Sequence, residues 1–155
     1  MNDTELMQIA IDEALKGLEL GDQPFGAVLA KDGEVICTGR NLEYSTFDPT
    51  AHAEIIAIRN GCEKLDSFQL DDCEIYCSCE PCPMCLSACY WSRIDKIYYA
   101  NTREDAKKID FDDSLIYEQL TKSIKERKIR MTQLMRNEAL KAFELWDKKT
   151  DKVKY

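Results

Sequence analysis

The chain has 155 residues, of which 45% are hydrophobic, and a formal net charge of −8. This length suits one domain of ordinary size, and this composition excludes a disordered chain. No apolar run approaches the ~20 residues that a membrane-spanning helix needs, and acidic residues stand at the N-terminus where a secretory signal carries basic ones. We therefore expect a soluble, cytoplasmic protein with no membrane partner.

Hydrophobic periodicity and turn residues divide the chain into helices and strands. Gly21 is a stop signal for the first helix, and Asp32-Gly33 is a strong hairpin-turn signal between two strand-like segments. Thr50 is a candidate N-cap for the second helix. In chain order, the sequence predicts a helix over 4–20, strands over 25–31 and 34–38, a helix over 50–62, a strand over 72–78, a helix over 82–92, a strand over 96–100, a helix near 114–121, a short strand over 129–134 and a helix near 137–148.

Helices that alternate with strands after an opening hairpin are typical of an α/β fold. The hairpin requires antiparallel pairing, whereas strands joined by helices pair in parallel, so the sheet should be mixed. We expect a three-layer α/β/α sandwich with a mixed sheet of about five strands.

Eight cysteines and a single histidine stand out in a chain of this length. Because cytosolic thiols stay reduced, a metal site or catalysis explains so many cysteines better than a disulfide framework does. We interpret Cys37, Cys62, Cys73 and Cys89 as small core residues. Any function that needs an imidazole must use His52.

Two short segments carry the chemistry: His-Ala-Glu at residues 52–54 and Pro-Cys-Pro-Met-Cys at residues 81–85. Cys82 and Cys85 share a helix face, and a helix N-terminus favours thiolates. With His52 they make the three protein ligands of a catalytic zinc site, which leaves one position for water. Zinc lowers the pKa of such a water towards ~7, and Glu54 can carry its proton. Residues two apart do not face each other on an ideal helix, so the convergence of His52 and Glu54 depends on how that helix begins.

Two other kinds of metal protein remain alternatives. The ferredoxin spacing C-x2-C-x2-C-x3-C is present, although Tyr90 replaces the expected proline and the reading leaves Glu54 without a purpose. The cysteines with this spacing are Cys79, Cys82, Cys85 and Cys89. The second alternative is a closed structural zinc site with Cys77 or Cys79 as fourth ligand, which also leaves Glu54 without a role.

His-x-Glu together with Pro-Cys-x-x-Cys is the signature of zinc-dependent deaminases. The whole chain resembles the cytidine-deaminase superfamily, and most closely its bacterial guanine deaminases. That resemblance implies hydrolysis of guanine to xanthine and ammonia, with one Zn2+ per subunit on His52, Cys82 and Cys85 and with Glu54 as the catalytic residue. The matching stretches are PFGAV (24–28), DPTAHAE (48–54), LDDC (70–73), SCEPCPMC (78–85), YW (90–91), FDDSLIY (111–117) and the final tyrosine.

The resemblance also implies a set of residues that bind the base. Asp113, from the FDDS match, suits the two hydrogen-bond donors beside the 2-amino group of guanine; alternatively, Asp112 and Asp113 cap the helix that starts near Ser114. Asn41 can serve the purine's acceptor atoms with its amide, or it is a simple turn residue.

The remaining candidates for binding the base are three side chains and one backbone segment. Phe25 and Trp91 can stack on the base, although core packing also explains Phe25. Ala53 can present backbone groups to it. By resemblance, the C-terminal tail closes over the pocket and places Tyr155 near the base, whereas a polar tail of this sort is usually frayed.

We predict one deaminase domain over residues 1–155. The resemblance also implies a homodimer in which residues 137–155 are exchanged between subunits. The net charge of −8 and the lack of an obvious basic patch argue against a nucleic-acid partner; we interpret the basic stretch at 122–130 as a solvated face. A free nucleobase is therefore the expected substrate. The alternatives are a tRNA-specific adenosine deaminase and a deaminase of cytidine or pterin type, since residues outside the motif decide the substrate.

Overall fold

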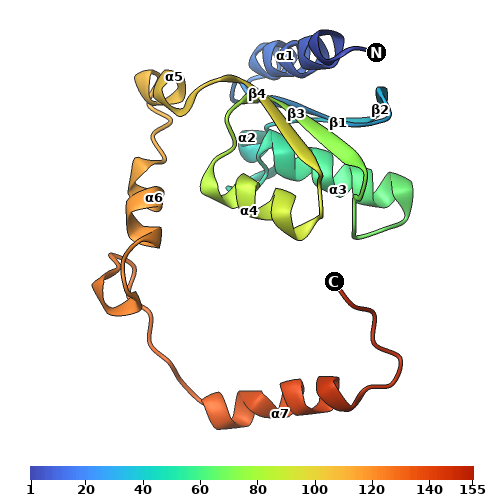
Figure 1. The fold of residues 1–155 in the computed structure, drawn as a ribbon. Helices are drawn as coiled ribbons and strands as arrows, with labels where there is room; N and C mark the ends of the chain where they lie inside the picture. The colour runs from blue at the N-terminus through green and yellow to red at the C-terminus, as the bar shows by residue number, and fades with distance from the viewer. The chain divides into compact units, whose positions relative to one another are not determined.

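A four-stranded sheet organises the N-terminal part of the chain, with its strands in the order β2-β1-β3-β4. The computed structural model describes residues 1–155, and it divides into two compact units, Met1–Ser114 and Leu115–Tyr155. No helix is both long enough and apolar enough to span a membrane. The elements, labelled in Figure 1, are α1 (Asp3–Glu19), β1 (Gly26–Lys31), β2 (Glu34–Arg40), α2 (Glu43–Thr46), α3 (Ala53–Leu65), β3 (Cys73–Cys79), α4 (Pro83–Trp91), β4 (Lys96–Asn101), α5 (Arg103–Lys108), α6 (Ser114–Leu120), η1 (Ile124–Glu126) and α7 (Arg136–Lys148).

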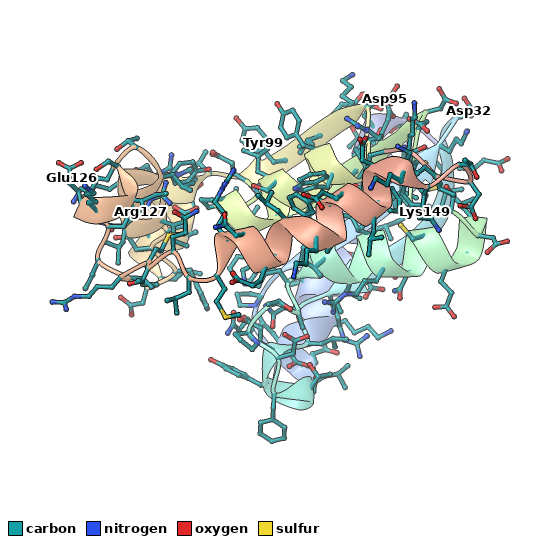
Figure 2. All side chains as sticks on the ribbon, turned by 90° about the horizontal axis from the view of Figure 1, so that it is seen from below. Asp32, Asp95, Tyr99, Glu126, Arg127 and Lys149 are labelled. Atoms are coloured by element: carbon teal, nitrogen blue, oxygen red, sulfur yellow. The ribbon has the colours of Figure 1, made fainter.

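The sheet is mixed, as predicted. β1 pairs antiparallel with both β2 and β3, and β3 pairs in parallel with β4. Asp32 and Gly33 have φ values of 51° and 76°, the left-handed conformation that a tight two-residue hairpin requires. β4 is an edge strand, and Tyr99 on it is 53% exposed (Figure 2).

Helices cover both faces of the sheet, which confirms the three-layer sandwich. Alternate residues of a strand point to opposite faces. Val28 therefore packs with Leu6 of α1 in one buried cluster, whereas Ala27 and Leu29 pack with Ala57 of α3 in the other. In Figure 1, α1 lies on one side of the sheet, and α3 and α4 lie on the other.

Two glycines let these helices approach the sheet closely. A Cβ atom at Gly26 would overlap backbone atoms of Ala10 and Ala14 in α1, and a Cβ at Gly39 would overlap backbone atoms of Ala53 and Ala57 in α3. The first turns of α3, where the predicted site begins, therefore lie directly on β2.

The unit Leu115–Tyr155 contains helices and no strand, so the predicted strand over 129–134 is wrong. A strand needs a neighbouring strand to satisfy its backbone donors and acceptors, and this unit has none. Ile129 and Leu134 are 82% and 80% exposed. The sheet consequently has four strands instead of the expected five.

Side-chain contacts hold the turn around η1 inside this unit. Glu126 accepts a hydrogen bond from the Ser123 hydroxyl at 2.7 Å, and Arg127 Nε donates to the backbone carbonyl of Gln119 at 3.3 Å. Glu126 and Arg127 are labelled in Figure 2. Local hydrogen bonds, and not pairing with another strand, therefore hold this part of the chain.

Candidate metal centre and active site

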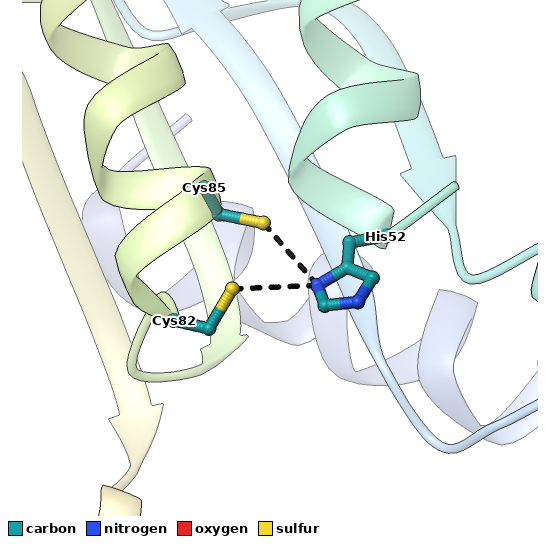
Figure 3. Close-up of side chains that lie close together, drawn as sticks. All are labelled: His52, Cys82 and Cys85. Carbon is teal, nitrogen blue, oxygen red and sulfur yellow. Dashed lines mark hydrogen bonds between the residues drawn. The ribbon is translucent and has the colours of Figure 1, made fainter. Parts of the chain in front are cut away.

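Three side chains from two helix starts bring their ligand atoms together. His52 Nδ1 lies 3.5 Å from Cys82 Sγ and 3.4 Å from Cys85 Sγ, as the dashed lines in Figure 3 show. The three ligand atoms lie within 4.8 Å of one another, and this group could hold a metal ion. The structure thus assembles the three residues that the sequence predicts as ligands.

The way α3 begins explains how His52 and Glu54 serve one site. His52 is the N-cap of α3, with φ −68° and ψ 156°, so it lies outside the helix and escapes the helical spacing. Glu54 lies in the first turn and is 8% exposed. The prediction that Thr50 caps this helix is wrong: its backbone N–H and its hydroxyl both donate to Asp48, in a turn that precedes the helix.

The second helix start repeats the arrangement. Cys82 is the N-cap of α4, with φ −66° and ψ 169°, and Pro83 follows as the first helical residue, where its missing N–H costs nothing. Cys85 lies in the first turn and is buried. Both predicted sulfur ligands therefore lie at the positive end of a helix dipole.

Hydrogen bonds within the group hold one sulfur as a thiolate. The Cys85 thiol, and then the His52 ring, lower the pKa of Cys82 to about 4. In return, the hydrogen bond to Cys82 raises the pKa of Cys85 and the pKa of His52. Cys82 is therefore anionic near neutral pH, which favours a bound cation, and a bound cation deprotonates coordinating thiols.

Glu54 has the surroundings of a general acid and base. Burial raises the pKa of its carboxyl above the ordinary value, and the negative charge of Cys82 adds to the effect. A carboxyl with a raised pKa transfers protons efficiently near neutral pH. Its charge also contributes to the raised pKa values of Cys77 and Cys89, secondary to their burial.

The donor set fits zinc. Tetrahedral zinc, with bonds of about 2.0 Å to nitrogen and 2.3 Å to sulfur, places those atoms roughly 3.5 Å apart, close to the 3.5 Å and 3.4 Å observed. One nitrogen and two sulfurs make three protein ligands, as in catalytic sites that keep a position for water. The ferredoxin and closed-zinc alternatives lack support, because the metal-binding group contains only His52, Cys82 and Cys85. The Cys79 thiol donates to the Thr102 carbonyl at 3.7 Å, and Cys77 and Cys89 pack in the core.

All eight cysteines are free thiols. The four that we interpreted as core residues pack in or against the cluster under α3, which confirms that interpretation. They are Cys37, Cys62, Cys73 and Cys89.

A buried amide network adjoins His52 and contains a residue that the sequence analysis missed. Glu43 Oε1 lies 3.6 Å from His52 Nε2, and Glu43 Oε2 accepts a hydrogen bond from Asn41 Nδ2 at 2.9 Å. Asn41, 1% exposed, accepts the backbone N–H of Glu43 at 3.0 Å and donates to Gln23 at 3.4 Å. Asn41 therefore forms a turn, the alternative role that the sequence offered for it. In the sequence, only the position of Glu43 two residues after Asn41 pointed to this contact.

Asp112 and Asp113 have different partners, so capping describes only one of them. Asp112 accepts hydrogen bonds from the backbone N–H and the hydroxyl of Ser114, at the start of α6. Asp113 accepts from Arg103 Nε at 3.3 Å, and its side chain is 18% exposed. The backbone N–H of Arg103 donates to Glu80 at 3.4 Å, which ties Asp113 to the loop that leads to Cys82. Sequence reasoning also missed Arg103.

The other candidate substrate residues lie in several places. The Phe25 ring meets the Phe111 ring edge to face, with centroids 5.0 Å apart, and Ala53 is buried at the start of α3. Trp91 is 64% exposed at the last residue of α4, roughly 13 Å along the helix from Cys82 at the helical rise per residue. Tyr155 belongs to the unit Leu115–Tyr155. Their roles toward a substrate stay predictions.

Comparison with known proteins agrees with this site. The family model described as the cytidine and deoxycytidylate deaminase zinc-binding region matches residues 1–101, which include all three ligands and Glu54. The chain belongs to this family. With the His/Cys/Cys group, membership identifies Zn2+ as the cofactor of this deaminase.

Several members of the family resemble the chain. The guanine deaminase of Bacillus subtilis is 44% identical over 156 residues, 100% of both chains, and its crystal structure matches with a TM-score of 0.96, covering 100% of this chain and 99% of that one. A tRNA-specific adenosine deaminase of Aquifex aeolicus is 40% identical over 61% of this chain and 62% of its own length. The protein NE0047, solved in complex with 2,6-diaminopurine, is 30% identical in sequence to this chain. Its structure matches with a TM-score of 0.68 over 70% of this chain and 61% of that one.

Proposed function

We propose that this deaminase hydrolyses guanine to xanthine and ammonia. The observation that carries the proposal is the similarity to the guanine deaminase of Bacillus subtilis, which extends over the whole chain at 44% identity. It includes residues 102–155, beyond the shared zinc-binding region, and residues outside the zinc motif decide which base is accepted.

In this proposal His52, Cys82 and Cys85 hold the zinc ion. When bound, zinc supplies the electrophile that makes water nucleophilic at neutral pH. The Glu54 carboxylate accepts the proton of the attacking water and delivers it to a ring nitrogen. The carbon of guanine that carries the amino group gains a C–O bond from the water. Glu54 then carries the second proton of that water to the amino group, the C–N bond breaks, and ammonia leaves. The burial of Glu54 supports this role, since it raises the pKa of the carboxyl above its ordinary value and makes the carboxylate a better proton acceptor.

Asp113 and Asn41 are the proposed contacts to the edge of the base. A carboxylate matches the ring N–H and the amine of guanine with charge-assisted hydrogen bonds, and Arg103 holds that carboxylate at 3.3 Å. The long 3.4 Å bond from Asn41 to Gln23 is the weaker of the two amide donations and the one that a purine acceptor replaces. Phe25, Ala53, Trp91 and Tyr155 complete the proposed set.

The proposal includes a homodimer and a cytoplasmic location. α7 carries large apolar side chains that are exposed, with Phe143 at 74% and Trp146 at 51%, and apolar patches of this kind support association. Eight free thiols support a reducing compartment. The exchange of residues 137–155 between subunits and the assignment of residues 1–155 to one domain stay predictions.

The experiment that tests the function is ammonia release, with the product identified by absorbance, from guanine, guanosine, adenine, cytosine, cytidine and a tRNA substrate. We expect turnover of guanine to xanthine and little of the others. The tRNA reaction is the competitor to exclude, because the Aquifex aeolicus relative is 40% identical. A net charge of −8 disfavours a polyanionic substrate. Release of ammonia from tRNA with guanine inert would overturn the proposal.

A further inference from the structure

One carboxylate joins the predicted metal ligand to the buried amide. Glu43, at the start of α2, places Oε1 3.6 Å from His52 Nε2 and accepts the Asn41 amide on Oε2 at 2.9 Å. Its side chain is only 17% exposed. Asn41 in turn accepts the backbone N–H of Glu43 at 3.0 Å, so the two residues fix each other's conformation.

The orientation of the His52 ring makes this contact consequential. A neutral imidazole carries its proton on one nitrogen and binds a metal through the other. Nδ1 faces the sulfurs of Cys82 and Cys85, so zinc binding requires the proton on Nε2. Nε2 faces Glu43, and a carboxylate favours an N–H directed at it. At 3.6 Å the contact is electrostatic and slightly longer than a hydrogen bond.

We propose that Glu43 is a positioning residue for the metal centre. Its carboxylate keeps the His52 proton on Nε2, leaves Nδ1 free to bind zinc, and adds a negative charge beside the site. Through its other oxygen it holds Asn41, so the same side chain sets a metal ligand and a proposed substrate contact. Carboxylates that orient a metal-bound histidine are worth about 10–100-fold in metal affinity or activity.

This inference rests on the proposed function only because both require zinc on His52. Its tests measure zinc release and the position of the His52 proton, and neither needs a substrate. The variant Glu43→Gln keeps the shape of the side chain and removes its charge. Its matched control is Glu63→Gln, which removes the same charge from an exposed position on α3, the helix that His52 caps.

The first measurement is the rate at which the zinc-loaded full chain releases zinc to an excess of a chromogenic chelator. We expect Glu43→Gln to release zinc about 10-fold faster than the native chain, and Glu63→Gln to release it at the native rate. Equal rates in Glu43→Gln and Glu63→Gln would overturn the proposal.

The second measurement needs no variant, so it decides the question even if Glu43→Gln fails to fold. His52 is the only histidine in the chain, so 15N NMR of histidine-labelled, zinc-loaded native protein reports one ring. We expect the metal on Nδ1 and the proton on Nε2, the nitrogen that faces Glu43. A proton on Nδ1 would overturn the proposal, whether or not guanine is a substrate.

Discussion

The starts of α1 and α5 differ from the starts of α3 and α4. Asn2 and Thr102 cap α1 and α5 in reciprocal capping boxes with Glu5 and Asp105. The N-cap residues of α3 and α4 are instead His52 and Cys82, and neither side chain makes a capping hydrogen bond. A good N-cap is worth about 1 kcal/mol, so these two helices give up local stability at the positions where ligands are needed.

The functional groups of this fold lie at the two helix starts that lack a side-chain cap. An N-cap residue has extended backbone and lies just outside the helix, so its side chain can point in a direction that helical spacing forbids. The next residues of the same turn then bring a second group to the site: Glu54 after His52, and Cys85 after Cys82. Two such starts, packed side by side on one face of the sheet (Figure 3), make a three-ligand centre with an adjacent carboxylate.

The largest expected effect comes from breaking a ligand at a helix start. Cys82→Ala should lose both bound zinc and deaminase activity, because two protein ligands hold zinc poorly. The control is Cys62→Ala, which truncates a cysteine packed against the core on α3 and should keep both. Zinc content by atomic absorption and ammonia release decide the outcome. A zinc-replete, active Cys82→Ala protein would remove that residue from the ligand set.

The next effect separates the two residues that share the start of α3. Glu54→Gln should lower the rate of ammonia release by about 10²–10⁴-fold, the contribution of a general acid and base, and should keep its zinc. The side chain does not belong to the ligand group, so metal content is the built-in control. Near-native turnover would exclude Glu54 from proton transfer.

Two glycine variants test how closely α1 and α3 must pack on the sheet. Gly26→Ala pushes against α1, and Gly39→Ala pushes against α3; overpacking typically costs about 1–3 kcal/mol. Denaturant unfolding should show a loss of stability in both variants. Only Gly39→Ala should also release zinc faster to a chelator, because it displaces the helix that His52 caps. Equal zinc release from the two variants would contradict the picture of α3 as the helix that positions the site.

The smallest effect belongs to the capped start. Asn2→Ala removes the side-chain cap of α1 and should cost about 1 kcal/mol of unfolding free energy. Zinc content and the rate of ammonia release should be unchanged, since α1 covers the opposite face of the sheet from α3 and α4 (Figure 1). A change in either quantity would show that the two faces are coupled.

Sequence reasoning succeeded where the signal is local. Asp32-Gly33 dictates a tight hairpin through its backbone conformation, and the Cys-x-x-Cys spacing brings two sulfurs together at the start of α4, one on its N-cap and one in its first turn. The strand at 129–134 failed because a strand depends on a partner elsewhere in the chain. Likewise, the contact of Glu43 with His52 and that of Arg103 with Asp113 bring together residues from different elements, which no local pattern predicts.

The helix that starts at His52 is an instructive intermediate case. Thr50 has the right chemistry for an N-cap, but Asp48 engages its backbone N–H and its hydroxyl first. The helix then begins two residues later than the N-cap preference predicts, at a residue that offers no cap. At this helix the N-cap position is occupied by a predicted metal ligand, His52, and not by the residue with the better capping propensity, Thr50.

In the proposed function, guanine hydrolysis depends on zinc held at these two helix starts by His52, Cys82 and Cys85. The most direct test is a titration of zinc into metal-free native protein, with the initial rate of xanthine formation from guanine measured at each step. We expect the rate to rise in proportion to zinc and to stop rising at about one zinc per chain, as three protein ligands with one open position imply. Full activity without zinc, or no xanthine at saturating zinc, would contradict it.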